Sequence, residues 1–183
     1  ATSFNQEIVS ELVTEDREVT EVDENGNETT TTVTDIVKNV MSLPTTASNV
    51  SRMLKDCTSF NKSLDKFDFT NVRNMTSFLE GATSFNQNIK DINVGNVTDM
   101  TAMLKGCTSF NQCFEGIDTS SVTTMESLLE GATSFNECIE KVNTANVTNM
   151  KNMLKGASSY NMPITKLDLT KVTTLEGFLE DAV

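Results

Sequence analysis

The chain has 183 residues, a formal net charge of −12 and no histidine or tryptophan. Such acidity disfavours nucleic acid and anionic membrane surfaces as partners, because both attract basic patches. Without histidine the chain lacks the commonest general base and metal ligand, so we expect no enzyme active site, no metal and no cofactor. No apolar run approaches the roughly 18–20 residues of a membrane span, so we expect no direct membrane insertion in this segment.

Residues 1–46 are predicted to be a partial repeat that carries an inserted acidic β-hairpin. The first eight residues, A-T-S-F-N-Q-E-I, match the end of the repeat described below, whereas residues 9–46 break its period. Residues 17–22 and 28–33 are rich in Val and Thr and flank an Asn-Gly turn signal, a pattern typical of a hairpin. Weak calcium binding by the acidic loop stays open, although Glu28 stands where a calcium loop has glycine.

Residues 47–183 repeat every 25 residues. The clearest column of equivalent positions is aromatic and consists of Phe60, Phe85, Phe110, Phe135 and Tyr160. A fixed period of this length predicts a single solenoid domain, in which each unit buries its apolar face against its neighbours. The sequence begins and stops inside a repeat, so we expect an array that is uncapped at both ends and belongs to a longer protein.

Each repeat predicts one short strand and one short helix. The pattern Leu64-x-x-Phe67-x-Phe69 indicates a strand. The helix is indicated by apolar spacing from Met75 to Leu79 and by a closing Gly81. Its expected N-caps are Asn49, Asn74, Asp99, Thr124, Asn149 and Thr174. The predicted fold class is therefore α/β, a right-handed solenoid of the leucine-rich-repeat type. The expected core columns are those of Val72, Met75, Phe78, Leu79, Ala82, Phe85, Ile89 and Ile92.

Three segments resemble a known repeat: D-T-S-S-V at 118–122, N-V-T-D-M at 96–100 and G-A-T-S-F-N-Q at 81–87. On these the chain is similar to the BspA-like leucine-rich-repeat surface proteins, including the repeat of many mycoplasma lipoproteins labelled a domain of unknown function. The family tryptophan is replaced here by Phe67, Ile92, Ile117, Val142 and Leu167. The resemblance implies an exported protein, extracellular or at the cell surface, of a kind often implicated in adhesion. It supplies no catalytic residues.

Two polar columns are candidate functional sites. The first is an asparagine ladder made of Asn61, Asn86, Asn111, Asn136 and Asn161. It is interpreted as structural, with a polar ligand site as the alternative. The second is a charge ladder made of Lys55, Glu80, Lys105, Glu130, Lys155 and Glu180. Its alternation avoids like-charge stacking and indicates a deeper period of 50 residues, with a charged binding stripe as the alternative.

The cysteines and threonines add two further hypotheses. Cys113 and Cys138 occupy one column on adjacent units, where a spacing of about 4.8 Å would allow a disulfide. Cys57 and Cys107 fall in a core column. A column of Arg73, Thr98, Thr123, Thr148 and Thr173 keeps ice binding as a remote alternative.

The sequence favours a non-enzymatic, surface-exposed repeat module for adhesion or for protein or glycan binding. The alternative is a structural component of a larger assembly or filament, whose partners are further copies or subunits. A monomer that shifts on adding ligand favours the first function, whereas self-association favours the second.

Overall fold

The computed structural model describes residues 10–22, 28–41 and 47–182. Two antiparallel strands, β1 (Ser10–Val22) and β2 (Glu28–Met41), pair from Val22 opposite Glu28 to Ser10 opposite Met41. They lie where the sequence predicts a hairpin, but they extend beyond the runs that indicated it. The pairing shifts register between Val13 and Thr14, which marks a β-bulge. The expected turn and the calcium-like pattern at 23–27, and the partial repeat at 1–8, lie outside the described residues.

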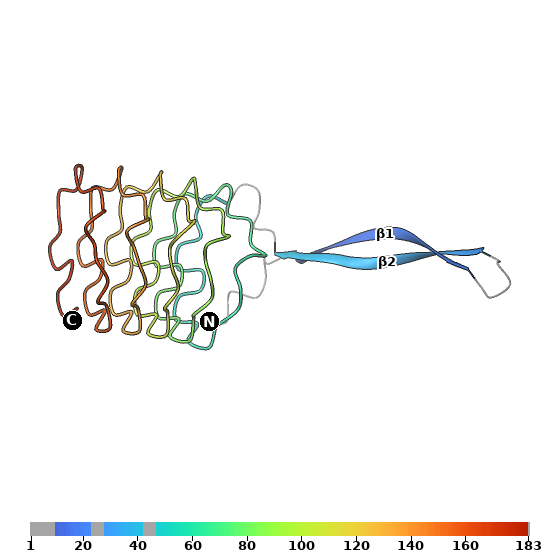
Figure 1. Ribbon diagram of the computed structural model, residues 1–183, viewed down its shortest axis with the longest axis horizontal. Helices are drawn as coiled ribbons and strands as arrows, with labels where there is room; N and C mark the ends of the chain where they lie inside the picture. Colours follow the sequence, from blue (N-terminus) through green and yellow to red (C-terminus); the bar gives the residue numbers. More distant parts are fainter. Residues whose placement is uncertain (1–9, 23–27, 42–46, 183) are drawn as a thin grey trace.

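Residues 47–182 form a stack of rungs, each rung being one 25-residue unit (Figure 1). Parallel bridges join equivalent positions of successive rungs. They run in order through Asn49, Asn74, Asp99, Thr124, Asn149 and Thr174. The 25-residue period is therefore confirmed, because every bridge joins residues that are 25 apart in the chain.

Backbone hydrogen bonds divide the turn segment, residues 74–82 and their equivalents, into two alternating sets. Every second amide donates to a carbonyl of the next rung at 2.8–2.9 Å, namely Met75, Ser77, Leu79 and Gly81. The amides between them donate three residues back within their own rung, namely Phe78, Glu80 and Ala82. The same four inter-rung bonds recur at each junction with distances of 2.7–3.2 Å. One set therefore joins neighbouring rungs and the other shapes the rung.

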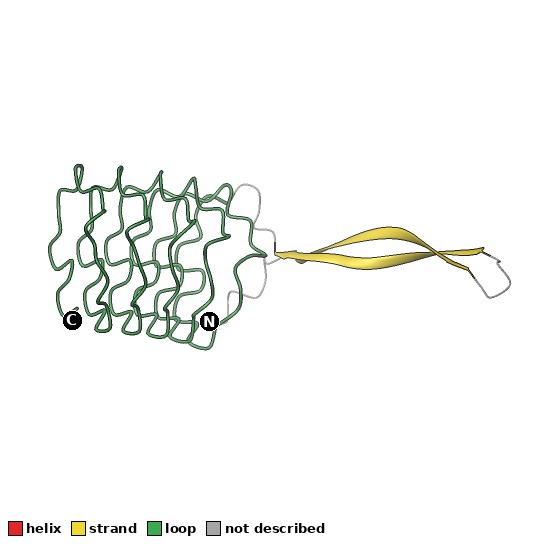
Figure 2. Cartoon of the chain, in the orientation of Figure 1, coloured by secondary structure: helices red, strands yellow, loops and turns green. Residues whose placement is uncertain are grey.

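The prediction of a short helix in each repeat is wrong for residues 47–182, where turns take its place (Figure 2). An α-helical amide donates to the carbonyl four residues back. The Phe78 amide instead donates to Met75, three residues back, and Ser77 has a φ of 56°, as the third residue of a type II turn does. The expected cap is present without its helix, because Asn74 Oδ1 accepts from the Thr76 amide at 2.9 Å. No helix of the described residues is long and apolar enough to span a bilayer.

The predicted strand is also missing from residues 47–182. The β contacts there are single bridges, in the Asn74 column and at Phe67, and they do not extend into a strand between residues 64 and 69. Leu64 and Phe69 are nevertheless fully buried. The Phe67 amide donates to the Leu64 carbonyl at 3.0 Å, so the chain turns between these inward-facing residues instead of extending.

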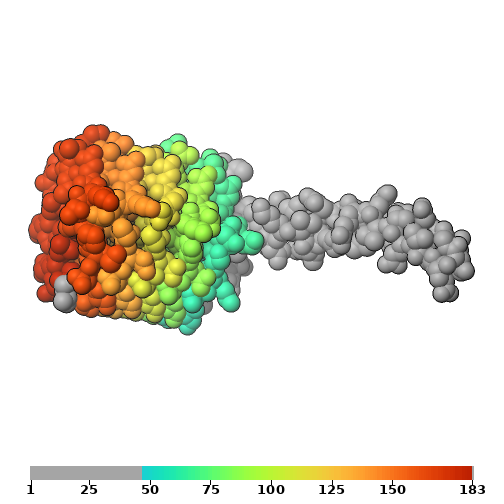
Figure 3. Space-filling model, in the orientation of Figure 1, coloured from blue at the N-terminus to red at the C-terminus, as the bar shows by residue number. Residues whose placement is uncertain are grey.

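The core runs continuously through the stack. The aromatic rings of Phe60, Phe85, Phe110, Phe135 and Tyr160 lie parallel, with centroids 5.8–6.0 Å apart. The eight expected core positions from Val72 to Ile92 are each at most 7% exposed. In the space-filling view the rungs appear as successive bands along the stack (Figure 3). Each rung thus buries its apolar groups against its neighbours, as repeat architectures do.

Candidate functional site

The asparagine ladder connects rungs through its side chains. The Asn86 amide donates to Asn61 Oδ1 at 3.0 Å. The amides of Asn111, Asn136 and Asn161 repeat this contact with the preceding asparagine at 2.8–2.9 Å. Because these oxygens already accept backbone hydrogen bonds, the column has little acceptor capacity left for a ligand.

The charge ladder makes an ion pair at every second junction. Three lysines contact the glutamate of the following rung, as Lys55–Glu80 and Lys105–Glu130 at 2.9 Å and as Lys155–Glu180 at 2.7 Å. The ladder therefore has the 50-residue period expected from the sequence. Burial alone would raise the pKa of Glu80 and of Glu130. Hydrogen bonds from Ser77 or Ser127 and from the ladder lysines, together with the lysine charges, outweigh this effect and hold each pKa below its ordinary value.

The expected disulfide between Cys113 and Cys138 is not formed, because all four cysteines are free thiols. Side chains in one column lie alongside each other, and Cys113 Sγ faces the carbonyl of Cys138 at 3.7 Å. Cys107 is a core residue whose Sγ donates to the Leu79 carbonyl. Burial raises the pKa of Cys107 to about 12, so this thiol stays protonated and unreactive near neutral pH.

The threonine column has its hydroxyl protons engaged. Thr98 Oγ1 donates to the carbonyl of Arg73 at 3.2 Å. The hydroxyls of Thr123, Thr148 and Thr173 donate in the same way to the preceding rung at 2.9–3.1 Å. These hydroxyls hold rungs together, which gives ice binding no specific support.

A polar hollow of about 400 Å³ opens on the side of the stack across successive rungs. It is lined by Asn88, Lys90, Asn111, Gln112, Cys113, Glu115 and Glu137. The Glu115 carboxylate is paired with Lys141, whereas Lys90 and Glu137 make no ion pair within the described residues. The hollow therefore offers one ammonium, one carboxylate and amide groups without a competing salt bridge between them.

Gln112 lines this hollow and is held by a hydrogen bond to the asparagine ladder. Its Nε2 donates to Asn86 Oδ1 at 2.9 Å, which leaves its Oε1 as an acceptor. Gln87 makes the matching contact to Asn61 at 2.8 Å, but it does not line the hollow. Gln112, Lys90 and Glu137 were not among the site residues predicted from the sequence. The one available signal was the change from glutamine to glutamate at position 137 in the Gln87 column.

Rungs joined at a constant 25-residue offset define this chain as a repeat protein. It belongs to the family described as Mycoplasma protein of unknown function, DUF285, whose model matches residues 27–116 and 112–183. No curated protein and no solved structure matches the chain.

Proposed function

We propose that the chain is a non-enzymatic binding module, exported and exposed at the cell surface, that holds a glycan in the polar hollow. The observation that carries this proposal is the set of unpaired polar groups around Gln112. The resemblance to BspA-like leucine-rich-repeat proteins supports a location at the cell surface. The cysteines give that location no support, since all four are free thiols. The same resemblance supports a right-handed solenoid related to leucine-rich repeats, with turns in place of helices.

The lining favours a glycan over an apolar ligand. Sugar hydroxyls both donate and accept; Gln112 offers its Oε1 as an acceptor, and Asn111, whose Oδ1 already accepts the Asn136 amide, offers its Nδ2 as a donor. Lys90 and Glu137 add a charged donor and a charged acceptor, whose hydrogen bonds are the stronger kind. Apart from the Cys113 thiol, the lining residues are all polar, so the hollow gives an apolar molecule little surface to bury.

The same groups make glycan hydrolysis a poor fit. Glycoside hydrolysis generally needs two carboxyl groups placed on either side of the bond to be cleaved. In the hollow Glu115 is held by Lys141, which leaves Glu137 as the one lining carboxylate without an ion pair among the described residues. Binding without turnover is therefore the simpler function for this arrangement.

The test is a glycan-array screen followed by titration calorimetry on the glycan that binds. Gln112→Ala should weaken binding several-fold to about tenfold, the loss expected for one hydrogen bond. Gln87→Ala is the matched control, because it loses the same contact to the asparagine ladder outside the hollow. Equal affinities for the wild type and Gln112→Ala, or no glycan bound at all, would exclude the hollow as a glycan site. Release of reducing sugar by the wild type would overturn the non-enzymatic assignment.

A further inference from the structure

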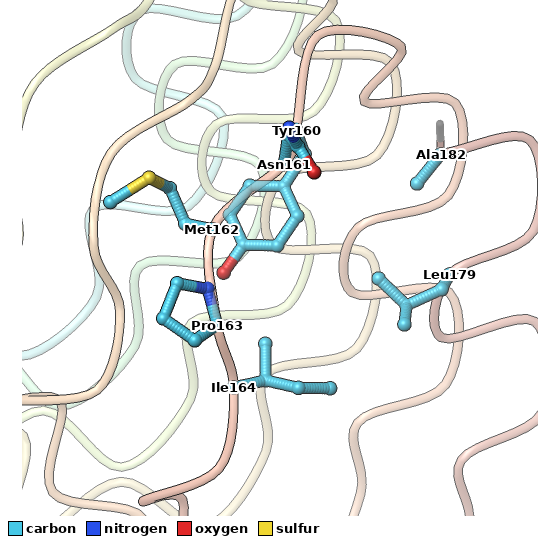
Figure 4. Close-up of a pocket in the computed structure, with 7 residues that line it drawn as sticks. All are labelled: Tyr160, Asn161, Met162, Pro163, Ile164, Leu179 and Ala182. Carbon is cyan, nitrogen blue, oxygen red and sulfur yellow. The ribbon is translucent and has the colours of Figure 1, made fainter.

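Two neighbouring thiols, those of Cys113 and Cys138, lie in the interior of the stack. They occupy equivalent positions on adjacent rungs, with described rungs on both sides. Both are half-buried free thiols, and Cys113 lines the polar hollow, so solvent reaches it. The column continues to Pro163, whose side chain has no ligating atom (Figure 4), and its earlier members are Ser63 and Asn88. The column therefore holds one adjacent pair of thiols.

The side chains of this column close a turn, and that role does not require cysteine. Ser63 Oγ accepts the amide two residues later at 3.2 Å, and Asn88 Oδ1 makes the same contact at 2.8 Å. Cys113 Sγ accepts the equivalent amide at 3.2 Å. Because serine and asparagine serve the turn equally, the property that cysteine adds here is its sulfur, which as a thiolate is a soft metal ligand.

The parallel arrangement of the two side chains separates their sulfurs. Cys113 Sγ faces the carbonyl of Cys138 at 3.7 Å rather than the second sulfur. Neighbouring parallel strands lie about 4.8 Å apart, whereas a disulfide bond is about 2.05 Å long. Metal–thiolate bonds are about 2.3 Å, so two sulfurs on opposite sides of one ion are about 4.6 Å apart. Side chains held parallel on adjacent rungs therefore suit an ion shared between the sulfurs.

Lys141 places a positive charge beside the pair. Its ammonium is paired with Glu115. The pKa of Lys141 lies above its ordinary value, first because of the hydrogen bond to Glu115 and further because of charge on Cys113 and Cys138. Both cysteines are thus close to the same ammonium, which would offset the negative charge of two bound thiolates.

We propose that Cys113 and Cys138 together bind one Cu(I) ion through two thiolate ligands. Structural zinc almost always takes four ligands, but no third His, Cys, Asp or Glu joins the pair within the part of the chain that the structure describes. Cu(I) is soft, is selected by thiolates and is satisfied by two of them in a line. Binding releases the two thiol protons to solvent and changes no oxidation state. A site of thiolates alone needs no histidine, which the chain lacks.

The experiment is an anaerobic competition titration of the reduced full chain against bathocuproine disulfonate, a chromophoric Cu(I) chelator. The wild type should take one Cu(I) per chain from the chelator, and more tightly as the pH rises, because binding releases protons. Cys113→Ser and Cys138→Ser should each weaken binding by more than the roughly 10–100-fold that loss of an outer-shell group causes. Cys57→Ser removes a half-buried thiol outside the pair, so this matched control should bind like the wild type.

Circular dichroism and thermal unfolding establish that each variant is folded. Cys113→Ser keeps the turn contact that Ser63 makes. Should it nevertheless unfold, Cys113→Asn replaces it, because Asn88 makes the same contact in the same column. A reduced wild type that takes no Cu(I) from the chelator overturns the proposal. So does a single-serine variant of the pair that binds Cu(I) as tightly as the wild type, since two thiolates would then not be needed.

Discussion

Phe110 shows how a single residue depends on its position in a column. Its ring lies fully buried between Phe85 and Phe135, with centroids 6.0 Å away on each side. Phe110→Ala should lower the free energy of unfolding by about 3–5 kcal/mol, because the rungs above and below cannot close the cavity. Urea denaturation measures this loss. Phe60→Ala, at the partly buried start of the column, is the control and should lose less. A loss below about 1 kcal/mol for Phe110→Ala would contradict the continuous aromatic core.

Glu80 and Glu130 predict how stability depends on pH. Both carboxylates have a folded-state pKa below the ordinary value of 4.5. The stabilisation that they supply is therefore complete above that value, and it is lost as the pH falls through the lowered folded-state pKa. Urea denaturation between pH 7 and about pH 3 should show unfolding free energy falling with pH, and falling less steeply in Glu80→Gln/Glu130→Gln.

Glu137→Gln provides the comparison, because it removes one negative charge outside the charge ladder. It should keep the steep acid dependence of the wild type. An unchanged pH dependence in the double variant would show that the ladder carboxylates do not contribute to acid unfolding.

At the scale of one element, the turn segment depends on left-handed backbone at fixed positions. Gly156 has a φ of 68°, and an added Cβ would meet only the Gly131 backbone at an ordinary 3.8 Å. Gly156→Ala should therefore cost the backbone penalty alone, about 1–2 kcal/mol. Gly156→Asn should cost less, because asparagine tolerates this region and Asp56 adopts it in the same column. Thermal unfolding measures the stability of both variants. An alanine variant as stable as the wild type would contradict the left-handed backbone at Gly156.

The turn segment also explains why the period could be predicted from the sequence and the element could not. Met75, Phe78 and Leu79 have the spacing of an apolar helix face. Turns in which an amide donates to the carbonyl three residues earlier bury the same three side chains. The deciding feature is the positive φ at Ser77 and its equivalents. Arginine, serine, alanine and asparagine occupy five of the six positions in that column and glycine only the last, Gly177, so the column as a whole carries little of the signal that glycine gives for a left-handed residue.

The candidate site was less predictable than the columns that surround it. A ladder needs only equivalent positions, so Asn111 and Lys105 could be assigned to ladders from spacing. The polar hollow depends on how far Lys90, Gln112 and Glu137 project from different rungs, and the 25-residue period carries no information about that. The thiols of Cys113 and Cys138 show the same limit, because sharing a column fixed their proximity and not the direction of their side chains.

On the scale of the whole molecule, the stack is built of two-rung blocks that alternate in charge. Deleting residues 85–109 keeps every column in phase but places Glu80 beside Glu130. We expect a folded, shorter stack that added salt stabilises, because screening weakens the new repulsion. Deleting residues 85–134 removes a complete block and places Glu80 beside Lys155, so salt should not stabilise that variant. Urea denaturation at low and high salt compares the two, and the same salt response in both would contradict the role given to the ladder.

The most direct test of the stacked-rung fold is cooperative urea unfolding of the chain lacking residues 85–134, followed by circular dichroism. Each rung contacts only its neighbours, so an in-phase deletion should leave a cooperative transition with a smaller dependence on urea, in proportion to the surface lost. The comparison variant lacks residues 85–96, which shifts every later column out of phase, and it should show no cooperative transition. An unfolded 85–134 deletion, or a 12-residue deletion that unfolds as cooperatively as the intact chain, would contradict the stack.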